Sequence, residues 1–219
     1  MKINIHLIIV TSLVMTLVIL HYLLINSAYD FTIDEASQDL TVKTLPLTLT
    51  TWEERCISET GEQTPCRQLQ HLQPGDILVT KSSFSLFYRH GHIGLVLDTD
   101  EGKVIEALGY GNVSTVESLE KWNDYPTVQI LRLKNDDQEL IEAIVDHAMD
   151  EYIGIPYSIF ATGTNMNQTH CSVLIWKIFN DFGFDLNSTG GKIITPRDIA
   201  NSEYLETIAA YGFGIDQVW

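Results

Sequence analysis

The pattern of apolar and polar positions divides the chain into an apolar leader, a polar segment and a larger domain. The leader follows Lys2, contains no charged residue from Ile5 to Ile25, and precedes acidic residues that begin at Asp30. It reaches the roughly 20 residues that a membrane-spanning helix needs and exceeds the roughly 7 to 15 of a signal-peptide core. Residues 1–28 are therefore predicted to form a signal anchor, with the N-terminus in the cytoplasm.

Two alternatives to this anchor remain open. The stretch Asn26-Ser27-Ala28 is a poor site for signal peptidase, but cleavage there makes the protein secreted. A buried core helix is the other alternative, which the uniform apolarity of the leader disfavours. We therefore expect a single-pass protein of the cell membrane, inserted through residues 5–25, with its main domain outside the cytoplasm.

The polar segment, residues 29–70, is rich in Ser, Thr, Asp and Glu, and its prolines interrupt any regular structure. It is predicted to be an extracytoplasmic stalk or N-terminal extension that leads into the domain, and its alternating residues 45–50 are a candidate for a short edge strand. Cys56 and Cys66 are candidates for a disulfide, which is more common than a metal site for such a pair in an exported protein. This pairing leaves Cys171 as an odd thiol that is either reactive or hidden in the core.

Residues 71–219 carry the periodicities of an α+β domain, with an antiparallel sheet packed against helices. Apolar alternation and short apolar runs predict strands over 77–80, 91–98, 103–108 and 127–133. Helical spacing predicts a helix that Asp136 or Asp137 caps and that runs to about Tyr152. Thr195-Pro196-Arg197-Asp198 is typical of a helix start, so Asp198 is interpreted as structural.

Cys171 is predicted to lie in the first turn of a buried helix that ends near Gly183. Leu174, Ile178 and Phe182 recur at helical spacing after it. Free backbone N–H groups and the positive end of the helix dipole favour a thiolate at that position. This meets one requirement for a sulfur nucleophile. The alternative is that Cys171 is a small core residue.

The strands 91–98 and 103–108 form a predicted hairpin that brings a histidine and a carboxylate to one face. Glu106 is expected directly across from His92 or one diagonal away. A carboxylate there can fix the tautomer of the imidazole and stabilise the imidazolium. The alternatives are a structural histidine and a carboxylate that faces water.

Two further residues are candidates for the lining of a substrate site. Tyr157 follows the helix that ends near Tyr152, and ordinary packing is its alternative role. His170 directly precedes Cys171 and is close enough to influence it, although a structural or solvated role is its alternative. His90 and His147 are interpreted as structural or solvated.

Charge excludes some partners. The chain has 13 Lys and Arg against 29 Asp and Glu, a formal net charge of −16, and no basic cluster interrupts the acidity. Nucleic acid and charge-driven docking on an anionic membrane are therefore disfavoured. A length of 219 residues with 45% apolar residues is sufficient for one well-packed domain and a leader.

The ordered motifs of residues 72–202 resemble the circularly permuted papain-like hydrolases of the NlpC class, in particular the YiiX/YycO-like branch. In those proteins a histidine strand precedes the cysteine helix, the reverse of the usual papain order. By this resemblance, Cys171 is the nucleophile, His92 is the base and Glu106 orients His92. Two positions depart from the family pattern: such relatives often have Tyr where this chain has His170, and commonly a polar residue where it has Val173. These departures affect the expected substrate preference. The motifs are Gln73-Pro74-Gly75-Asp76-Ile77-Leu78, Gly91-His92-Ile93-Gly94-Leu95-Val96, Val104-Ile105-Glu106-Ala107, Cys171-Ser172-Val173-Leu174-Ile175-Trp176 and the segment 190–199.

The resemblance implies a cysteine peptidase or amidase that acts through a thioester and uses no metal or other cofactor. The implied substrate is a peptide or amide, such as a peptidoglycan stem peptide with a D-amino acid or a γ-linked glutamate. Two alternatives remain: a lipid-directed thiol acyltransferase or esterase, and a non-catalytic binding module of the same fold.

Overall fold

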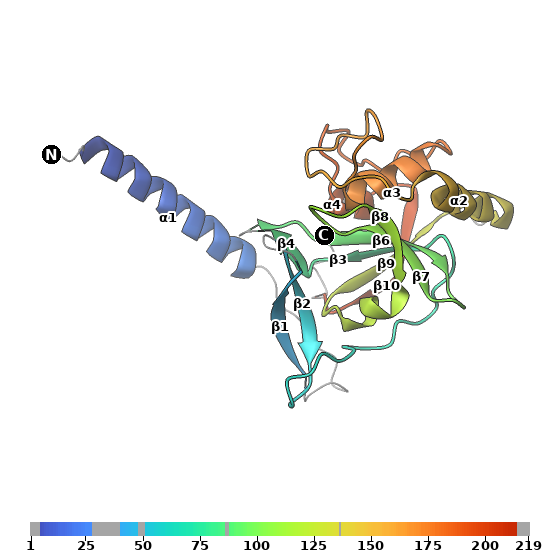
Figure 1. The fold of residues 1–219 in the computed structure, drawn as a ribbon, viewed down its shortest axis with the longest axis horizontal. Helices are drawn as coiled ribbons and strands as arrows, with labels where there is room; N and C mark the ends of the chain where they lie inside the picture. Colours follow the sequence, from blue (N-terminus) through green and yellow to red (C-terminus); the bar gives the residue numbers. More distant parts are fainter. Residues whose placement is uncertain (1–4, 28–39, 48–50, 86–87, 136, 214–219) are drawn as a thin grey trace.

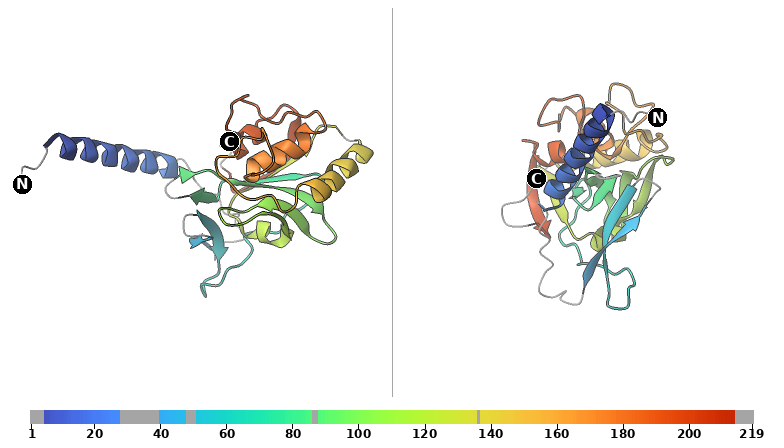
Figure 2. Two further views of the ribbon diagram at one scale, coloured as in Figure 1. Left: turned by 45° about the horizontal axis from the view of Figure 1, so that its top comes forward. Right: turned by 90° about the vertical axis from the view of Figure 1, so that its left-hand side faces the viewer.

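Two antiparallel sheets and a layer of helices make up the body of the protein (Figure 1). The computed structural model describes residues 5–27, 40–47, 51–85, 88–135 and 137–213. An N-terminal helix, α1 (Ile5–Ser27), extends away from this body in Figure 1 and in the left-hand view of Figure 2. No helix in the described ranges is both long and apolar enough to cross a membrane. The anchor predicted for residues 1–28 is therefore not shown.

The larger sheet has six strands and contains the predicted hairpin. Its central strands are rich in Ile, Leu and Val and are buried on both faces, as expected where each face is covered. In spatial order the strands are β10 (Leu205–Tyr211), β9 (Val128–Leu133), β3 (Ile77–Thr80), β6 (His92–Asp98), β7 (Lys103–Ala107) and β8 (Ser114–Ser118).

Helices α2 (Gln138–Glu151), α3 (Cys171–Asn180) and α4 (Pro196–Ala200) lie on one side of this sheet (Figure 2). Asp137 caps α2, and Thr195 with Asp198 forms the capping box of α4. The core on this side includes Ile93 and Leu95 of β6 and Leu174 of α3. The prediction of an antiparallel sheet packed against helices is confirmed.

The opposite face of the sheet packs on the 3₁₀ helix η2 (Leu119–Asp124). Trp122 and Tyr125 are fully buried there, together with Val96 and Val104. Successive residues of β6 therefore face different cores, and His92 lies on the same face as Val96. The side chain of Trp122 stacks against the ring of His92, with ring centroids 5.7 Å apart.

The described part of the expected stalk is instead folded onto the domain. A second sheet has the order β1 (Thr41–Pro46), β2 (Thr51–Ile57), β4 (Ser83–Ser85) and β5 (Tyr88–Arg89). Although β2 carries Glu53, Glu54 and Arg55, all three are buried. Burial of these charges is possible because Glu53 pairs with Arg55 and Glu54 pairs with Arg89. Cys56 at the end of β2 forms a disulfide with Cys66.

Candidate functional site

The register of β6 and β7 brings His92 and Glu106 together. Leu95 pairs with Ile105 and Val96 with Val104, so Glu106 stands one diagonal position from His92 on the same face. His92 Nε2 lies 3.0 Å from Glu106 Oε2. Both side chains are buried, His92 at 4% exposure and Glu106 at 0%. Of the two arrangements expected from the sequence, the structure has the diagonal one.

Gly94 provides the space for this contact. A Cβ atom at Gly94 would lie 2.8 Å from Val104 Cγ2, 3.0 Å from Glu106 Cγ and 3.2 Å from Trp122 Cζ2. Contacts this short force a side chain to move, and all three neighbours are fully buried. Position 94 therefore requires glycine, because the packed side chains around it leave no room for a Cβ atom.

Replacement of Gly94 by alanine is expected to destabilise the protein by about 1–3 kcal/mol, the usual cost of an extra methyl group in a packed core. It should also displace Glu106 from His92. Urea denaturation followed by tryptophan fluorescence measures the first effect. Gly111→Ala adds a methyl group where nothing lies within 4 Å, although its positive φ adds local strain. A loss of stability in Gly94→Ala no larger than in Gly111→Ala would contradict the packing argument.

Glu106 accepts two further hydrogen bonds that the sequence did not indicate. Lys121 Nζ donates to Oε2 and Trp122 Nε1 donates to Oε1, each at 2.5 Å. Burial raises the pKa of Glu106, but the hydrogen bond and charge of His92 and the charge of Lys121 outweigh it and lower the pKa to about 2. Glu106 is therefore an ionised carboxylate throughout the neutral range.

Cys171 lies in the first turn of α3, with His170 as the N-cap residue. Its thiol is 6% exposed. Burial raises the pKa of Cys171, but hydrogen bonds with His170 and His92 and the charges of both rings lower it well below its ordinary value. The position at a helix N-terminus acts in the same direction. The arrangement favours a thiolate.

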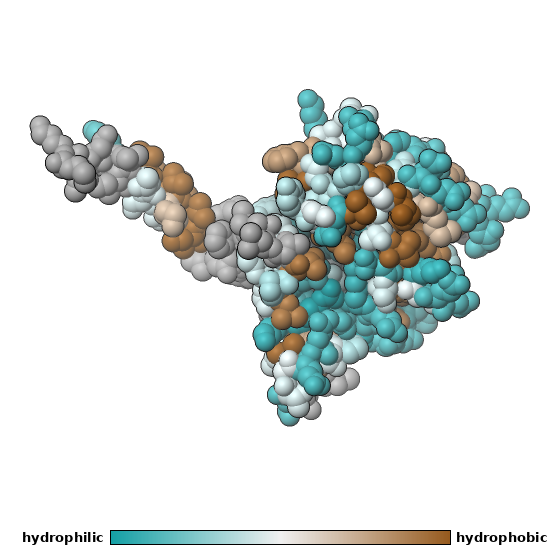
Figure 3. Space-filling view, in the orientation of Figure 1, coloured by the Kyte–Doolittle hydropathy of each residue, from teal (hydrophilic) through white to brown (hydrophobic). Residues whose placement is uncertain are grey.

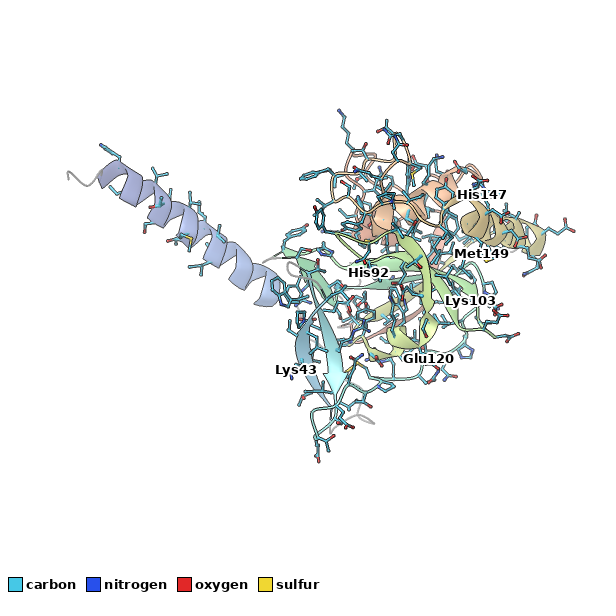
Figure 4. All side chains as sticks on the ribbon, in the orientation of Figure 1. Lys43, His92, Lys103, Glu120, His147 and Met149 are labelled. Atoms are coloured by element: carbon cyan, nitrogen blue, oxygen red, sulfur yellow. A yellow bond between two sulfur atoms is a disulfide. The ribbon has the colours of Figure 1, made fainter. Side chains whose placement is uncertain are left out.

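The ring of His92 connects the sulfur to the carboxylate. Burial lowers its pKa, but hydrogen bonds with Cys171 and Glu106 and the charges of both raise it to about 10. Because Nε2 is engaged by Glu106, Nδ1 is the nitrogen left to exchange a proton with Cys171. The three side chains that the sequence singled out are thus brought together from β6, β7 and α3 (His92 is labelled in Figure 4).

Alkylation of Cys171 by iodoacetamide is expected to reach half its maximal rate well below pH 9, the ordinary pKa of a thiol. His92→Gln and His170→Gln each remove a ring that lowers the pKa of Cys171, so each should move this midpoint to higher pH. His147→Gln alters a histidine on α2 that binds Asp181 instead, and should leave the midpoint unchanged. Alkylation rates measured by mass spectrometry over a range of about pH 4 to pH 10 give the midpoint for each protein. A midpoint near pH 9 in the parent protein would refute a preformed thiolate.

Tyr157 and His170 lie beside the sulfur. Tyr157 forms a bridge with Thr169, the residue before His170, and its half-buried ring is near enough for the charge of Cys171 to help burial raise its pKa. His170 is buried. Neither position tests a role in substrate binding, which stays a prediction.

His90 was interpreted as structural or solvated, but it also lies near the sulfur. Burial lowers its pKa, and the charge of Cys171 opposes this effect. Its Nδ1 donates to the carbonyl of Gly91 at 2.5 Å, so Nε2 accepts from the hydroxyl of Ser85 at 2.9 Å. This is a neutral ring held by its neighbours. In the sequence, two signs of this cluster of three histidines around one thiol were visible: His170 directly precedes Cys171, and His90 lies two positions from His92.

Within the ranges that the structure describes, no group of three or more His, Cys, Asp and Glu is arranged to hold a metal ion.

Comparison with known proteins supplies the family. A curated relative, the uncharacterized protein YycO of Bacillus subtilis, is 30% identical over 163 residues, which are 71% of this chain and 63% of that protein. The chain thus spans less than two thirds of the length of this relative. The crystal structure of the metalloprotein YiiX from Escherichia coli O157:H7 covers 63% of this chain and 96% of its own, with a TM-score of 0.49 and 17% identity. Residues 71–213 match the description "permuted papain-like amidase enzyme, YaeF/YiiX, C92 family". With a histidine strand that precedes a cysteine helix and a match over most of its length, this chain belongs to that family of permuted papain-like amidases.

Proposed function

We propose that this protein is a thiol amidase in which Cys171 is the nucleophile, His92 the general base and acid, and Glu106 the residue that orients His92. The observation that carries the proposal is the contact of a buried imidazole with a thiol at a helix N-terminus on one side and an ionised carboxylate on the other. Membership of the amidase family supports the type of bond. All three positions hold groups suited to these roles.

The first half of the reaction forms a thioester. The thiolate of Cys171 attacks the carbonyl carbon of the amide, and the negative charge moves to the carbonyl oxygen. The backbone N–H of Cys171 lies in the first turn of α3, where helix geometry leaves it without an intrahelical acceptor, so it is a suitable donor to that oxygen. The imidazolium of His92 then gives its proton to the leaving nitrogen, and the C–N bond breaks.

The second half restores the enzyme. Neutral His92 accepts a proton from water, and the resulting hydroxide attacks the thioester carbonyl. The C–S bond breaks, a carboxylic acid leaves, and the sulfur returns to the thiolate paired with the imidazolium. Throughout both halves Glu106 keeps the ring in one tautomer and stabilises its positive charge. This role requires Glu106 to stay ionised, which its pKa of about 2 favours.

The proposed substrate is an amide bond of a cell-wall peptide. The resemblance to NlpC-class hydrolases suggests a bond that involves a D-amino acid or a γ-linked glutamate, as in a peptidoglycan stem peptide. A location outside the cytoplasm agrees with such a substrate.

We also propose that the domain is exported, with residues 1–28 retained as an anchor or removed as a signal peptide. The disulfide between Cys56 and Cys66 supports export, since such bonds persist in oxidising compartments and are rare in the cytosol. N-terminal sequencing of the protein from its own cells distinguishes the two fates. A mature chain that begins near residue 29 means secretion, and one that begins at residue 1 means anchoring.

Incubation of the purified full-length protein with wall stem peptides tests the activity. Mass spectrometry should detect a new amine and a new carboxylate in equal amounts with the parent protein and neither with Cys171→Ala. The alanine variant keeps the helix and the sheet, because it replaces only a sulfur by a hydrogen atom. Equal product from both proteins would refute Cys171 as the nucleophile.

A second candidate, a thiol acyltransferase or esterase that acts on lipids, is favoured by one observation. Two joined loops, one of which contains Tyr157 near the sulfur, expose large apolar side chains, with Tyr110 at 82% and Phe160 at 88% exposure. These loops are joined where Tyr157 N donates to Asn112 O and where Val113 bridges Pro156. Figure 3 shows hydrophobic surface on the body at the level of α3, against a mainly hydrophilic lower part. Cys171-dependent loss of acyl chains from phospholipid micelles, without cleavage of wall peptides, would select this candidate.

A further inference from the structure

The strand β2 lies outside residues 71–213, the part that matches the family, yet it is almost wholly buried against that part. It brings Glu53, Glu54 and Arg55 into the interior. Burying a charge is costly unless it is paired and hydrogen-bonded. The partners of these three residues therefore indicate what the strand does.

Arg55 connects the strand to η2. Its Nη1 donates to the backbone carbonyl of Lys121 at 2.5 Å, and its Nη2 donates to Glu53 Oε2 at 2.5 Å. The guanidinium lies over the ring of Tyr125, 3.7 Å from the centroid. Tyr125 in turn donates its hydroxyl hydrogen to Glu53 Oε1 at 2.6 Å. The arginine fork is thus fixed on both sides, and it fixes the backbone of η2.

The residue whose carbonyl Arg55 holds also binds Glu106. Lys121 Nζ and Trp122 Nε1 both donate to the carboxylate of Glu106, and the carboxylate binds His92. A displacement of η2 would therefore move two of the three donors to Glu106. The path from Arg55 to His92 is a chain of direct contacts in which only Lys121 is partly exposed.

A second connection reaches His92 from the other direction. Glu54 binds Arg89 through both carboxylate oxygens, at 2.5 and 2.6 Å. Arg89 directly precedes His90, Gly91 and His92, and it also donates to the carbonyl of Lys81 at 3.0 Å. The strand β2 therefore holds both the carboxylate behind His92 and the backbone that leads into it.

The disulfide fixes the end of β2 on the same helix. Cys66 is bonded to Cys56 and donates its backbone N–H to the carbonyl of Asn123 in η2 at 2.8 Å. Asn123 Oδ1 accepts from the backbone N–H of Leu69 at 2.8 Å. The covalent bond thus holds Arg55, one residue before Cys56, against η2.

We propose that β2 is a positioning element of the active site, in which Arg55 sets the geometry of Glu106 and His92 through Lys121 and Trp122. The functional unit then begins at the hairpin of residues 41–57 instead of at residue 71. This inference rests on the proposed roles of Cys171 and His92. Arg55 itself contacts neither of them and is a positioning residue.

Arg55→Met in the full-length protein tests the proposal. We expect kcat on the peptide substrate to fall by about 10- to 100-fold with KM little changed, since small misplacements of catalytic groups have effects of this order. We also expect the midpoint of iodoacetamide alkylation of Cys171 to rise by about one pH unit, a tenfold loss of thiolate at low pH. A poorly held Glu106 stabilises the imidazolium of His92 less, and so the thiolate less. An unchanged midpoint would overturn the proposal even if kcat fell.

Two further variants make the result decisive. Arg55→Lys keeps the charge but lacks the fork that reaches the carbonyl and Glu53 together, so it should shift the midpoint in the same direction by less. If Arg55→Met does not fold, the midpoint measured for Arg55→Lys tests the proposal in its place. Arg132→Met breaks the ion pair of Arg132 with the buried Asp76, which does not reach Glu106, and should leave the midpoint unchanged. Equal shifts in the Arg132 and Arg55 variants would mean general destabilisation and would overturn the proposal.

Alkylation of Cys171 requires no substrate. If the parent protein cleaves no peptide but the Arg55 variants still shift the midpoint, the proposed function fails and the positioning role of β2 stands. If the parent cleaves peptide and the midpoints of the Arg55 variants do not change, the proposed function stands and the positioning role of β2 fails.

Discussion

An enzyme with alanine in place of His92 is expected to turn over its amide substrate roughly 10⁴- to 10⁶-fold more slowly than the parent, as in other enzymes whose nucleophile and base act as one unit. The variant loses the group that stabilises the thiolate and the acid that protonates the leaving nitrogen. Steady-state kinetics should show the loss in kcat. The substrate is the wall peptide that the parent cleaves.

The matched control is His147→Ala. His147 lies on α2, bound to Asp181, and is well separated from His92 in Figure 4. This variant should retain kcat within about twofold, since surface substitutions of this kind change stability by about 0.5 kcal/mol or less. A His92→Ala enzyme with more than a hundredth of the parent kcat would remove His92 from the mechanism.

Glu106→Ala is expected to lower the free energy of unfolding by about 3–5 kcal/mol, the cost of breaking a buried ion pair by removing one partner. Lys121 then loses its anion, the protonated ring of His92 keeps only the thiolate of Cys171, and the N–H of Trp122 loses its acceptor. Urea denaturation at pH 7 measures the loss. Glu101→Ala, which removes a largely exposed carboxylate that pairs with Lys103, should change stability by about 0.5 kcal/mol or less.

The pH dependence of stability provides an independent test of Glu106. Its folded pKa of about 2 lies below the ordinary 4.5, so its contribution is fully present above pH 4.5 and is lost as the pH falls through about 2. Glu106→Gln keeps the shape but removes the titrating group. The stability difference between the parent and Glu106→Gln should therefore shrink on acidification. A difference that stays constant from pH 6 down to about 2 would contradict an ionised Glu106.

Local periodicity was sufficient to predict the elements that carry the three reacting groups. The apolar spacing after Cys171 defines α3, and the turn residues near Asp100 define the hairpin of β6 and β7. These features depend on residues that are close in sequence. The meeting of α3 with that hairpin was instead implied by the family resemblance, because no periodicity reports a contact between distant segments.

The second sheet could not be predicted for a physical reason. A strand with Glu53, Glu54 and Arg55 in succession is typical of a solvated segment, since charges favour water. It is buried here because its partners, among them Arg89 and Tyr125, come from distant parts of the chain. Lys121 and Trp122 could not be predicted as donors to Glu106 for the same reason, because the fold and not the local sequence brings them to the carboxylate. Only the carboxylate of Glu106, which interrupts an apolar strand, indicated that buried donors had to exist.

The bond between Cys56 and Cys66 has a consequence for the order in which the chain is made. Synthesis runs from the N-terminus, and so does translocation of an exported chain. Under the proposed export, Cys56 and Cys66 would reach the oxidising side before Cys171 follows. They would then pair with each other before a third cysteine competes. The order of the three cysteines along the chain would thereby protect the thiol of Cys171 from wrong pairing.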